Sequence, residues 1–158
     1  MAKGKTNAMR LLDAAKLSYE VLSYESKDGK IDGLSVAGKI GKNPECVYKT
    51  LVAQGSSKAV YVFVIPVGDE LSLKKAAAAA GEKKVEMVAV KDIQKLTGYI
   101  RGGCSPVGMT KKYPTFIHEA CEGNEEIIVS AGKIGMQVAL APSDLAEQTS
   151  AQFADLIQ

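Results

Sequence analysis

The segment from residue 98 to residue 109, GYIRGGCSPVGM, limits more than any other how this chain folds. It holds four glycines and one proline in twelve residues, a density that neither a regular helix nor a central strand tolerates. Glycine adopts positive φ and lets other groups approach its backbone, so the loop can present bare N–H groups to a ligand. Because the loop also carries the apolar residues Tyr99, Ile100, Val107 and Met109, we expect these side chains to pack on the core and the glycines to face outward, as one wall of a pocket.

The length and composition of the chain predict one globular domain, residues 1–158. Of its 158 residues, 46% are hydrophobic and 24% are charged, and the net charge is +2, which is typical of a soluble protein without a general coat for nucleic acid. The first residues carry no signal-peptide pattern, and no apolar run approaches the roughly 18 residues of a membrane span. We therefore expect a cytoplasmic protein with no membrane contact.

Periodicity and turn residues predict an α+β fold. Apolar spacing of three and four residues indicates helices, alternation indicates strands, and glycine, proline and N-cap residues set their ends. The turn at residues 55–57, Gly-Ser-Ser, predicts a hairpin between two strands. The expected helices are 6–16 (N-cap Thr6; apolar stripe Ala8, Met9, Leu11, Leu12 and Ala15), one from Ser35 to Gly41, 71–80, 90–96, and a last one capped by Ser143; the expected strands are 19–24, 49–54, 59–66, 85–88, 115–119, 126–130 and 137–141.

The chain lacks the residues of most catalytic and metal sites. Its one histidine, His118, lies in an alternating strand, where a lone histidine is usually structural, and a Ser-His-Asp triad would have to use it. The three cysteines are far apart and form no C-x-x-C pair, which favours reduced thiols over a zinc site or disulfides. The glycine motifs of nucleotide-binding sites are missing as well. We expect no metal and no cofactor, so an enzyme of this composition would work with lysine, hydroxyls, backbone amides or the substrate itself.

Two further segments can supply such groups. Lys49 and Thr50 open an otherwise apolar strand; Lys49 is either the polar end of an edge strand or a cation that holds a phosphate or polarises an ester carbonyl. Residues 130–135, SAGKIG, are either a plain β-turn or a second small-residue loop beside the pocket. The lysine pairs at 74–75, 83–84 and 111–112 are either solvated surface or a grip on a phosphate backbone.

These segments together resemble the YbaK family, the stand-alone relatives of the prolyl-tRNA synthetase editing domain. The resemblance extends over almost the whole chain, with the motifs in the same order, which makes it far more specific than a single glycine loop. It is carried by Lys49-Thr50-Leu51-Val52, by the stretches 74–76, 83–87 and 97–108, and by Ser130-Ala131-Gly132-Lys133 with Gly135.

The resemblance implies a single α+β domain with a curved, mixed, barrel-like sheet and helices around it. It implies an aminoacyl-tRNA deacylase that removes cysteine mischarged onto tRNA(Pro), an error that arises because a pocket separates analogues of similar size by only about 1–3 kcal/mol. In the reaction that the family implies, the substrate's cysteine thiol attacks its own ester and leaves as a cyclic thiolactone, so no protein nucleophile is needed. The implied partners are the acceptor end of aminoacyl-tRNA and, transiently, prolyl-tRNA synthetase.

The resemblance also implies roles for single residues. Lys49 corresponds to the family's essential lysine, which positions the terminal adenosine or its phosphate and the ester. Gly102 corresponds to the loop glycine whose N–H faces the carbonyl oxygen as negative charge develops. Tyr24 is either a pocket tyrosine or a half-buried strand aromatic. The implied catalytic residues are Lys49 and Gly102, and the implied substrate-binding residues are Tyr24, Thr50, Gly103 and Ser130.

Three positions depart from the family pattern and leave the amino-acid specificity open. Ile31 and Asp32 stand where cysteine-specific members carry a phenylalanine, and Gln137 stands near the place of an aspartate. Cys104 replaces an aliphatic residue and is either a small apolar filler or a reactive thiol. One alternative is therefore a deacylase for another small amino acid, such as alanine, with a lysine-oriented water. Another is a non-catalytic module that binds tRNA or the synthetase, or that has a regulatory role.

Overall fold

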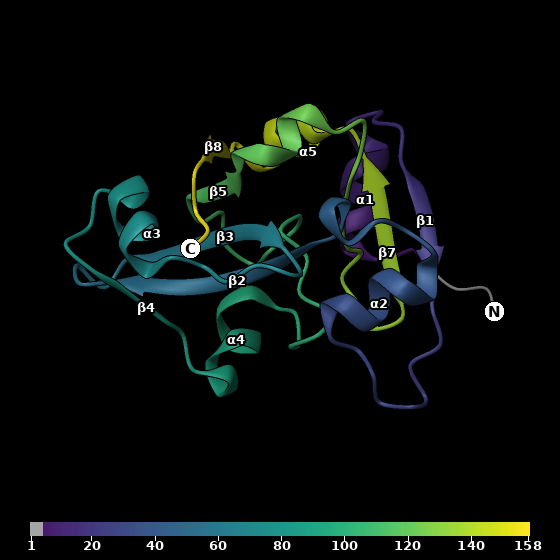
Figure 1. The fold of residues 1–158 in the computed structure, drawn as a ribbon, viewed down its shortest axis with the longest axis horizontal. Helices are drawn as coiled ribbons and strands as arrows, with labels where there is room; N and C mark the ends of the chain where they lie inside the picture. Colours follow the sequence, from purple (N-terminus) through teal and green to yellow (C-terminus); the bar gives the residue numbers. More distant parts are fainter. Residues whose placement is uncertain (1–4) are drawn as a thin grey trace.

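The computed structural model describes residues 5–158, whose strands form two sheets (Figure 1). A mixed five-stranded sheet has the order β4-β2-β3-β5-β8, and an antiparallel three-stranded sheet has the order β1-β7-β6. One isolated parallel bridge, between Val47 and Ile128, joins them. The strands are β1 Glu20–Ser23, β2 Tyr48–Gly55, β3 Val60–Pro66, β4 Val85–Met87, β5 Thr115–His118, β6 Ile127–Ser130, β7 Met136–Leu140 and β8 Gln152–Ala154.

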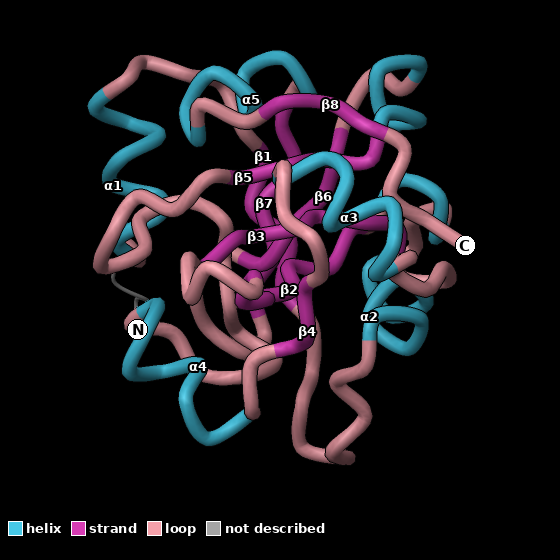
Figure 2. The backbone as a smooth tube through the Cα atoms, turned by 90° about the vertical axis from the view of Figure 1, so that its left-hand side faces the viewer, coloured by secondary structure: helices cyan, strands magenta, loops and turns pink. Residues whose placement is uncertain are grey.

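Helices cover both sides of the β2–β3 hairpin. Figure 1 shows α3 above this ribbon and α4 below it, and the rotated view of Figure 2 agrees. The helices are α1 Asn7–Ala14, α2 Gly33–Ile40, α3 Leu73–Ala80, α4 Val90–Thr97 and α5 Pro142–Thr149, with short 3-10 turns at Pro44–Cys46 and Glu119–Gly123. The α+β prediction and the 49–54/59–66 hairpin are confirmed. The expected barrel-like sheet differs in one respect, because the Val47–Ile128 bridge does not close the two sheets into a barrel.

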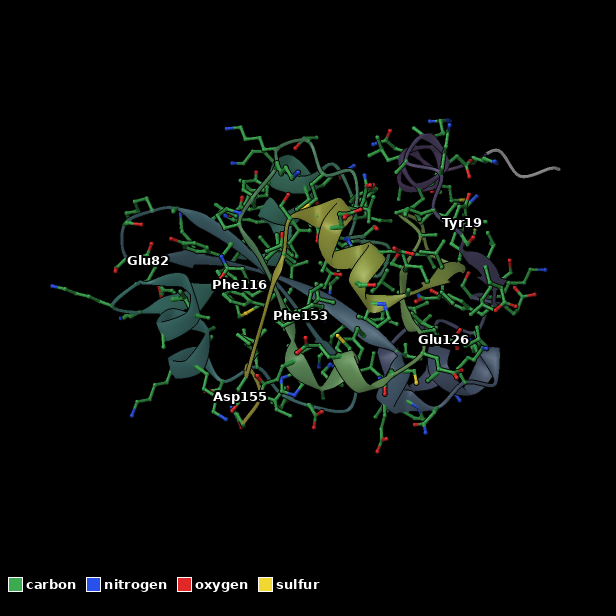
Figure 3. All side chains as sticks on the ribbon, turned by 90° about the horizontal axis from the view of Figure 1, so that it is seen from above. Tyr19, Glu82, Phe116, Glu126, Phe153 and Asp155 are labelled. Atoms are coloured by element: carbon green, nitrogen blue, oxygen red, sulfur yellow. The ribbon has the colours of Figure 1, made fainter. Side chains whose placement is uncertain are left out.

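The core is organised by β3, whose two faces are both buried. Val62 and Val64 pack on one side, in the cluster that α1, α5, β6 and β7 complete. Phe63 and Ile65 point to the other side, where α3 covers them. The ring of Phe63 stacks on that of Phe116 with centroids 5.6 Å apart, and Figure 3 shows Phe116 in the middle of the molecule. A strand buried on both faces must be continuously apolar, as the sequence VYVFVIP of β3 is.

Helix ends follow the capping rules at most positions. The Thr6 side chain accepts a hydrogen bond from Met9 N, which confirms the predicted N-cap. The predicted Ser143 cap is wrong: Ala141 occupies the N-cap position and Pro142 begins α5, since proline at the first helical position needs no N–H partner. Leu11, assigned to the apolar stripe of this first helix, is 36% exposed, and Ala15 is exposed too. The strand β8 was not expected, because three residues are too few to show alternation.

The predicted cytoplasmic location depends on the first residues and on the helices. Residues 1–4, on which the absence of a signal pattern rests, lie outside the described residues. Between residues 5 and 158, none of the helices combines the length and the apolar character that crossing a bilayer requires. The assignment of residues 1–158 to a single domain stays a prediction.

Replacing Phe63 by alanine tests the role of β3. Phe63 is fully buried, so the change removes apolar burial and leaves a cavity, and we expect a loss of about 3–5 kcal/mol in the free energy of unfolding. Urea denaturation followed by circular dichroism measures it. The matched control is Leu34→Ala, at a side chain that is 54% exposed, for which we expect a change within about 0.5 kcal/mol. Equal effects of the two variants would contradict this account of the core.

Candidate active site

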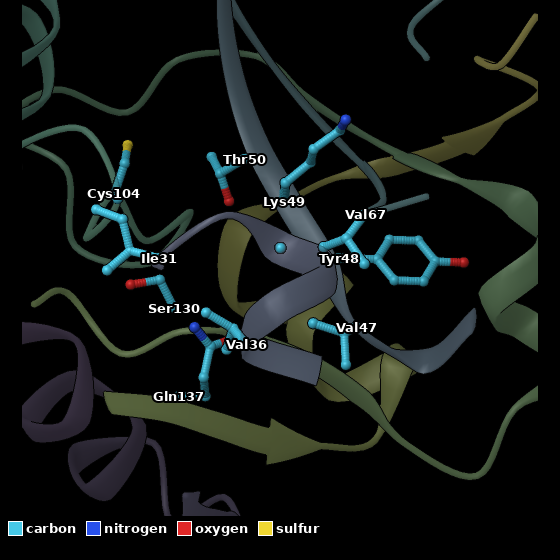
Figure 4. A pocket seen from close by; sticks show the side chains of 12 residues that line it. Ile31, Val36, Val47, Tyr48, Lys49, Thr50, Val67, Cys104, Ser130 and Gln137 are labelled. Carbon is cyan, nitrogen blue, oxygen red and sulfur yellow. The ribbon is translucent and has the colours of Figure 1, made fainter. Parts of the chain in front are cut away.

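The sequence-predicted residues meet in a cavity of about 110 Å³ between the two sheets (Figure 4). One wall is the start of β2, a second is the N-terminal part of α2, a third is the glycine loop, and a fourth is the β6–β7 pair. The lining residues are Ile31, Gly33, Val36, Val47, Tyr48, Lys49, Thr50, Val67, Gly102, Cys104, Ser130 and Gln137. Of the residues assigned to the site, Lys49, Thr50, Gly102 and Ser130 are thus together.

Lys49 and Thr50 occupy neighbouring positions of β2 but serve different parts of the cavity. Figure 4 shows the Lys49 side chain extending away from Ser130 and Gln137. Its Nζ lies 4.0 Å from Glu70 Oε2, and its side chain keeps 32% of its surface exposed. The cation therefore stands at the mouth of the cavity, where an anionic group of a ligand would arrive.

Three lining residues have a buried side-chain oxygen without a hydrogen-bond partner within residues 5–158, namely Thr50, Gln137 and Tyr48. Figure 4 shows the Tyr48 ring turned away from Ser130 and Gln137, which leaves Thr50 Oγ1 and Gln137 Oε1 for a ligand in the cavity. Gln137 is only 7% exposed and faces Ser130 across the β6–β7 pair. An unsatisfied buried polar atom costs about 1–3 kcal/mol, so a ligand that bonds to these two atoms recovers free energy on binding.

The glycine loop and the β6–β7 turn touch backbone to backbone. A Cβ atom on Gly103 would lie 2.9 Å from Ile134 N and 3.0 Å from Lys133 Cα, and one on Gly132 would lie 2.9 Å from Tyr99 Cε1. Tyr99 spans its own loop by donating a hydrogen bond from its hydroxyl to Val107 O at 2.6 Å. The expectation that the loop's glycines face outward is therefore wrong for Gly103, which is buried because the second loop packs on it.

Gly102 is the glycine of this loop that lines the cavity. Its φ is +88°, a conformation that favours glycine, and a Cβ there would lie 2.9 Å from Ile31 Cδ1. Within residues 5–158, its N–H donates no hydrogen bond, whereas Gly103 N donates to Ile100 O at 3.0 Å. This N–H is thus available to an acceptor atom on a ligand.

Ser130 contributes a hydroxyl at the end of β6. Its Oγ accepts a hydrogen bond from Gly132 N at 3.2 Å, which also fixes the start of the second loop. Because the oxygen is used as an acceptor, the hydroxyl hydrogen remains for a ligand.

Cys104 is a neutral thiol in this setting. Its Sγ donates a weak hydrogen bond to Thr97 Oγ1 at 3.9 Å, and burial raises the pKa of the Cys104 thiol to about 11. Since the thiolate is the nucleophile and the metal ligand, this pKa favours the filler interpretation over the reactive one.

His118 lies outside the cavity. It is 6% exposed, and its Nδ1 accepts a hydrogen bond from Leu156 N at 3.2 Å, which ties β5 to the C-terminal segment. These contacts agree with the structural role that the sequence predicts for this histidine. Among residues 5–158, no group of three or more His, Cys, Asp or Glu side chains is close enough together to hold a metal ion.

Tyr24 and Gly103 do not line the cavity, and their assignment to substrate binding stays a prediction. Tyr24 directly follows β1, its N–H donates a hydrogen bond to Gly135 O at 2.9 Å, and its ring lies under Lys39 Nζ at 5.8 Å. The lysine pairs are also elsewhere. Lys74, Lys83 and Lys84 border a cleft beside α3, and Lys111 and Lys112 border another beside Met109.

Sequence reasoning missed the wall that α2 provides. A Cβ on Gly33 would lie 2.3 Å from Val67 Cγ1, so glycine is what lets the start of α2 settle on the end of β3. Asp32 caps the helix by accepting a hydrogen bond from Ser35 N at 3.1 Å, and the hydrogen bonds from the Ser35 hydroxyl and N–H lower the pKa of Asp32 below its ordinary value. The sequence signal was present in the order Asp-Gly-Leu-Ser at residues 32–35, an N-cap followed by a serine.

Comparison with known proteins now connects this cavity to a family. The family of aminoacyl-tRNA editing domains matches residues 34–147. The chain belongs to the aminoacyl-tRNA editing domain family. The matched range includes β2, the glycine loop, the β6–β7 pair and all of α2 except Gly33, so all four cavity walls lie at least in part within it. The resemblance to YbaK-type proteins is confirmed.

A protein from Enterococcus faecalis resembles the chain over almost its full length. The protein EbsC of Enterococcus faecalis, named as a candidate Cys-tRNA(Pro)/Cys-tRNA(Cys) deacylase, is 45% identical over 152 residues, which are 96% of this chain and 93% of EbsC.

Solved structures agree with the fold of this editing domain. The crystal structure of a candidate trans-editing enzyme for prolyl-tRNA synthetase superposes with a TM-score of 0.83 at 24% identity, over 99% of each chain. That of a hypothetical protein gives a TM-score of 0.88 at 22% identity, over 97% of this chain and all of the other. At these identities the likeness establishes the fold alone.

Alanine at position 103 tests the contact between the two loops. Its Cβ would collide with the Lys133–Ile134 backbone, so we expect Gly103→Ala to lower the free energy of unfolding by about 1–3 kcal/mol. Gly38→Ala is the matched control: a Cβ at Gly38, in α2, has no neighbour within 4 Å, and we expect it to stabilise by about 0.5–1 kcal/mol. Urea denaturation measures both, and a neutral or stabilising Gly103→Ala would contradict the described contact.

The pH dependence of cysteine alkylation tests the state of Cys104. Because the pKa of Cys104 is raised to about 11, the thiolate fraction is small at neutral pH. We therefore expect the rate of alkylation by iodoacetamide to keep rising with pH up to about 11. Peptide mass spectrometry at pH 7 to 10 separates Cys104 from the other cysteines. Cysteine in an unfolded peptide, with its pKa near ~8.5, is the reference. A plateau below pH 9 for Cys104 would show an activated thiol.

Proposed function

We propose that the protein is a trans-editing deacylase that removes cysteine from mischarged tRNA, with Cys-tRNA(Pro) as its substrate. The observation that carries the proposal is the small cavity where Thr50 Oγ1 and Gln137 Oε1 lie buried with no hydrogen-bond partner among residues 5–158, beside Lys49 and Gly102. Its volume of about 110 Å³ suits a small aminoacyl group. Membership of the editing domain family and the 45% identity to EbsC support the same substrate class.

In the proposed reaction the cavity residues position the substrate, and none of them acts as the nucleophile. The Cys104 thiol is protonated at neutral pH because burial raises its pKa to about 11, and His118 lies outside. The substrate's own thiol, with an ordinary pKa near ~8.5, is partly ionised and strongly nucleophilic. In the proposed reaction its sulfur bonds to the ester carbonyl carbon, the bond from that carbon to the ribose oxygen breaks, and the thiol proton ends on the released ribose hydroxyl. Cysteine leaves as a cyclic thiolactone.

The residues act on this reaction by holding and by stabilising charge. Lys49, at the mouth, holds the terminal phosphate or orients the ester, with Thr50 beside it. The N–H of Gly102 donates to the carbonyl oxygen as it becomes negative, a contribution typically worth a factor of 10² to 10³ in rate. Ser130 and Gln137 orient the amino acid. Enforced geometry gives intramolecular attack an effective molarity of roughly 10⁵ M or more.

The partners follow from the substrate. A cavity of this size reads the amino acid and the end of the tRNA, so selection among tRNAs falls to another molecule, and we propose a transient complex with prolyl-tRNA synthetase. Because mischarged tRNAs are made and used in the cytoplasm, the proposal includes a cytoplasmic location. It includes neither a metal nor a cofactor in the reaction.

Deacylation of cysteinyl-, alanyl- and prolyl-tRNA(Pro) tests the proposal. We expect the wild type to cleave the cysteinyl ester selectively and Lys49→Ala to lower that rate by roughly 10²-fold or more. Lys42→Ala is the matched control. Lys42 Nζ lies 3.2 Å from Glu126 Oε2, and Lys42 does not line the cavity, so the rate of this variant should stay within about twofold of the wild type. The rates are measured as the loss of labelled amino acid from the tRNA over time.

The other outcomes separate the alternatives. Preference for the alanyl ester, which carries no thiol, would replace substrate-assisted attack by a lysine-oriented water. Binding of tRNA with no turnover of any ester would leave a non-catalytic or regulatory module. An unchanged rate for Lys49→Ala would remove Lys49 from the mechanism.

A further inference from the structure

A second cavity, of about 200 Å³, adjoins the proposed ester site. The two cavities share Thr50, Gly102 and Cys104 as a common wall. The rest of the second cavity comes from β2, from β4, from α4 and from the start of the glycine loop, namely Leu51, Val52, Met87, Val90, Ile93 and Arg101. Its lining is therefore apolar, with Arg101 as its single charged member.

The rim of this second cavity exposes large apolar side chains. Met87 is 46% and Val90 is 54% exposed, and Leu51 and Ile93 are half-buried. Exposed apolar surface that gathers around a hollow is typical of a binding site. Covering such surface contributes about 25 cal/mol of favourable free energy per Å² removed from water. The ester cavity is different, since it offers buried polar atoms without partners.

We propose that the second cavity binds the terminal adenine base of the substrate tRNA, with Arg101 stacked on the base. The inference rests on the proposed function: the ester to be cleaved is attached to the ribose of the terminal nucleotide, so the base lies one ribose away from the ester. A flat ring with apolar faces fits between aliphatic side chains, and a guanidinium plane stacks on such rings. The shared wall at Thr50 is then where the ribose lies.

The volumes of the two cavities assign the two parts of the substrate. The ester cavity has about half the volume of the second one, so it suits the cysteinyl group, which is smaller than adenine and whose amino group can donate a hydrogen bond to Gln137 Oε1. Apart from the shared Thr50, no side chain of the second lining has a buried nitrogen or oxygen without a hydrogen-bond partner within residues 5–158. Stacking without such atoms binds the end of any tRNA, so this subsite gives affinity and places the ester without reading tRNA identity.

Two small esters test the subsite directly. The 3′-cysteinyl ester of adenosine carries the base, and cysteine methyl ester does not, so the ratio of their kcat/KM values reports the contribution of the base. We expect the wild type to prefer the adenosine ester by roughly tenfold or more, the usual effect of stacking one base. We expect Arg101→Ala combined with Val90→Ser to lower this ratio roughly tenfold.

The control variants keep charge and hydrophobicity changes away from the cavity. Lys95→Ala removes a cation from α4 at a side chain that is 76% exposed, and Val21→Ser replaces a 42% exposed valine on β1; both should retain the wild-type ratio. A wild-type ratio near one, or an unchanged ratio in the Arg101/Val90 variant, would overturn the subsite. An equal loss of kcat/KM on both esters leaves the ratio unchanged and would place the effect of the substitutions on the fold or on the chemistry.

A binding measurement separates this inference from the proposed function. Adenosine 5′-monophosphate is titrated into the isotope-labelled protein, with ribose 5-phosphate as the probe that lacks the base. We expect the adenosine compound alone to shift the methyl signals of Met87, Val90 and Ile93. If neither cysteinyl ester is cleaved but these shifts occur, the deacylase proposal fails and the base subsite stands. If the esters are cleaved and no shifts occur, the subsite fails alone.

Discussion

The close approach of two glycine-containing loops is the constraint on which the rest of the site depends. Gly103 lies against the backbone of Lys133 and Ile134, and Gly132 lies against the ring of Tyr99. At Gly103 no side chain stands between the loops, so their separation there is set by backbone contact, and at Gly132 it is set by the Tyr99 ring, whose hydroxyl is bonded to Val107 O of its own loop. That separation fixes the distance between Gly102 on one loop and Ser130 at the base of the other, and thereby the width of the cavity.

This rigidity fits the chemistry that the cavity contains. Its residues include a lysine at the mouth, the oxygens of Thr50 and Gln137 and the N–H of Gly102, none of which has a hydrogen-bond partner in the described part of the chain apart from the lysine, whereas the nearby thiol of Cys104 is neutral. Such groups bind and orient, and they cost no reorganisation when charge develops on a ligand. The polar atoms left unpaired destabilise the empty cavity, which is the usual cost of a prepared site.

Local sequence signals predicted the elements but not how they meet. The hairpin of β2 and β3 was predictable because its turn and its apolar runs are contiguous, and the Thr6 cap because capping acts over three residues. The burial of Gly103 was not, since the atoms that enclose it come from residues about 30 positions later. For the same reason the sequence could assign Thr50 and Ser130 to one site only through a family resemblance, and it gave no reason to include α2 in the wall.

Amino-acid selectivity in this chain depends on a wall that differs from the pattern its resemblance implies. Ile31 lies where an aromatic ring would be expected, and its Cδ1 stands close to Gly102, so an aliphatic group closes the cavity over the loop. Gln137 stands near the place of a carboxylate and leaves its amide oxygen without a partner within residues 5–158. A neutral amide attracts an ammonium group less strongly than a carboxylate does, while the narrow cavity still rejects large side chains. Selectivity is then set more by size than by charge, and a pocket that selects by size separates amino acids that differ by one small group by about 1–3 kcal/mol. Discrimination between cysteine and alanine therefore has to come from the reaction itself, in which only one of the two carries the attacking thiol.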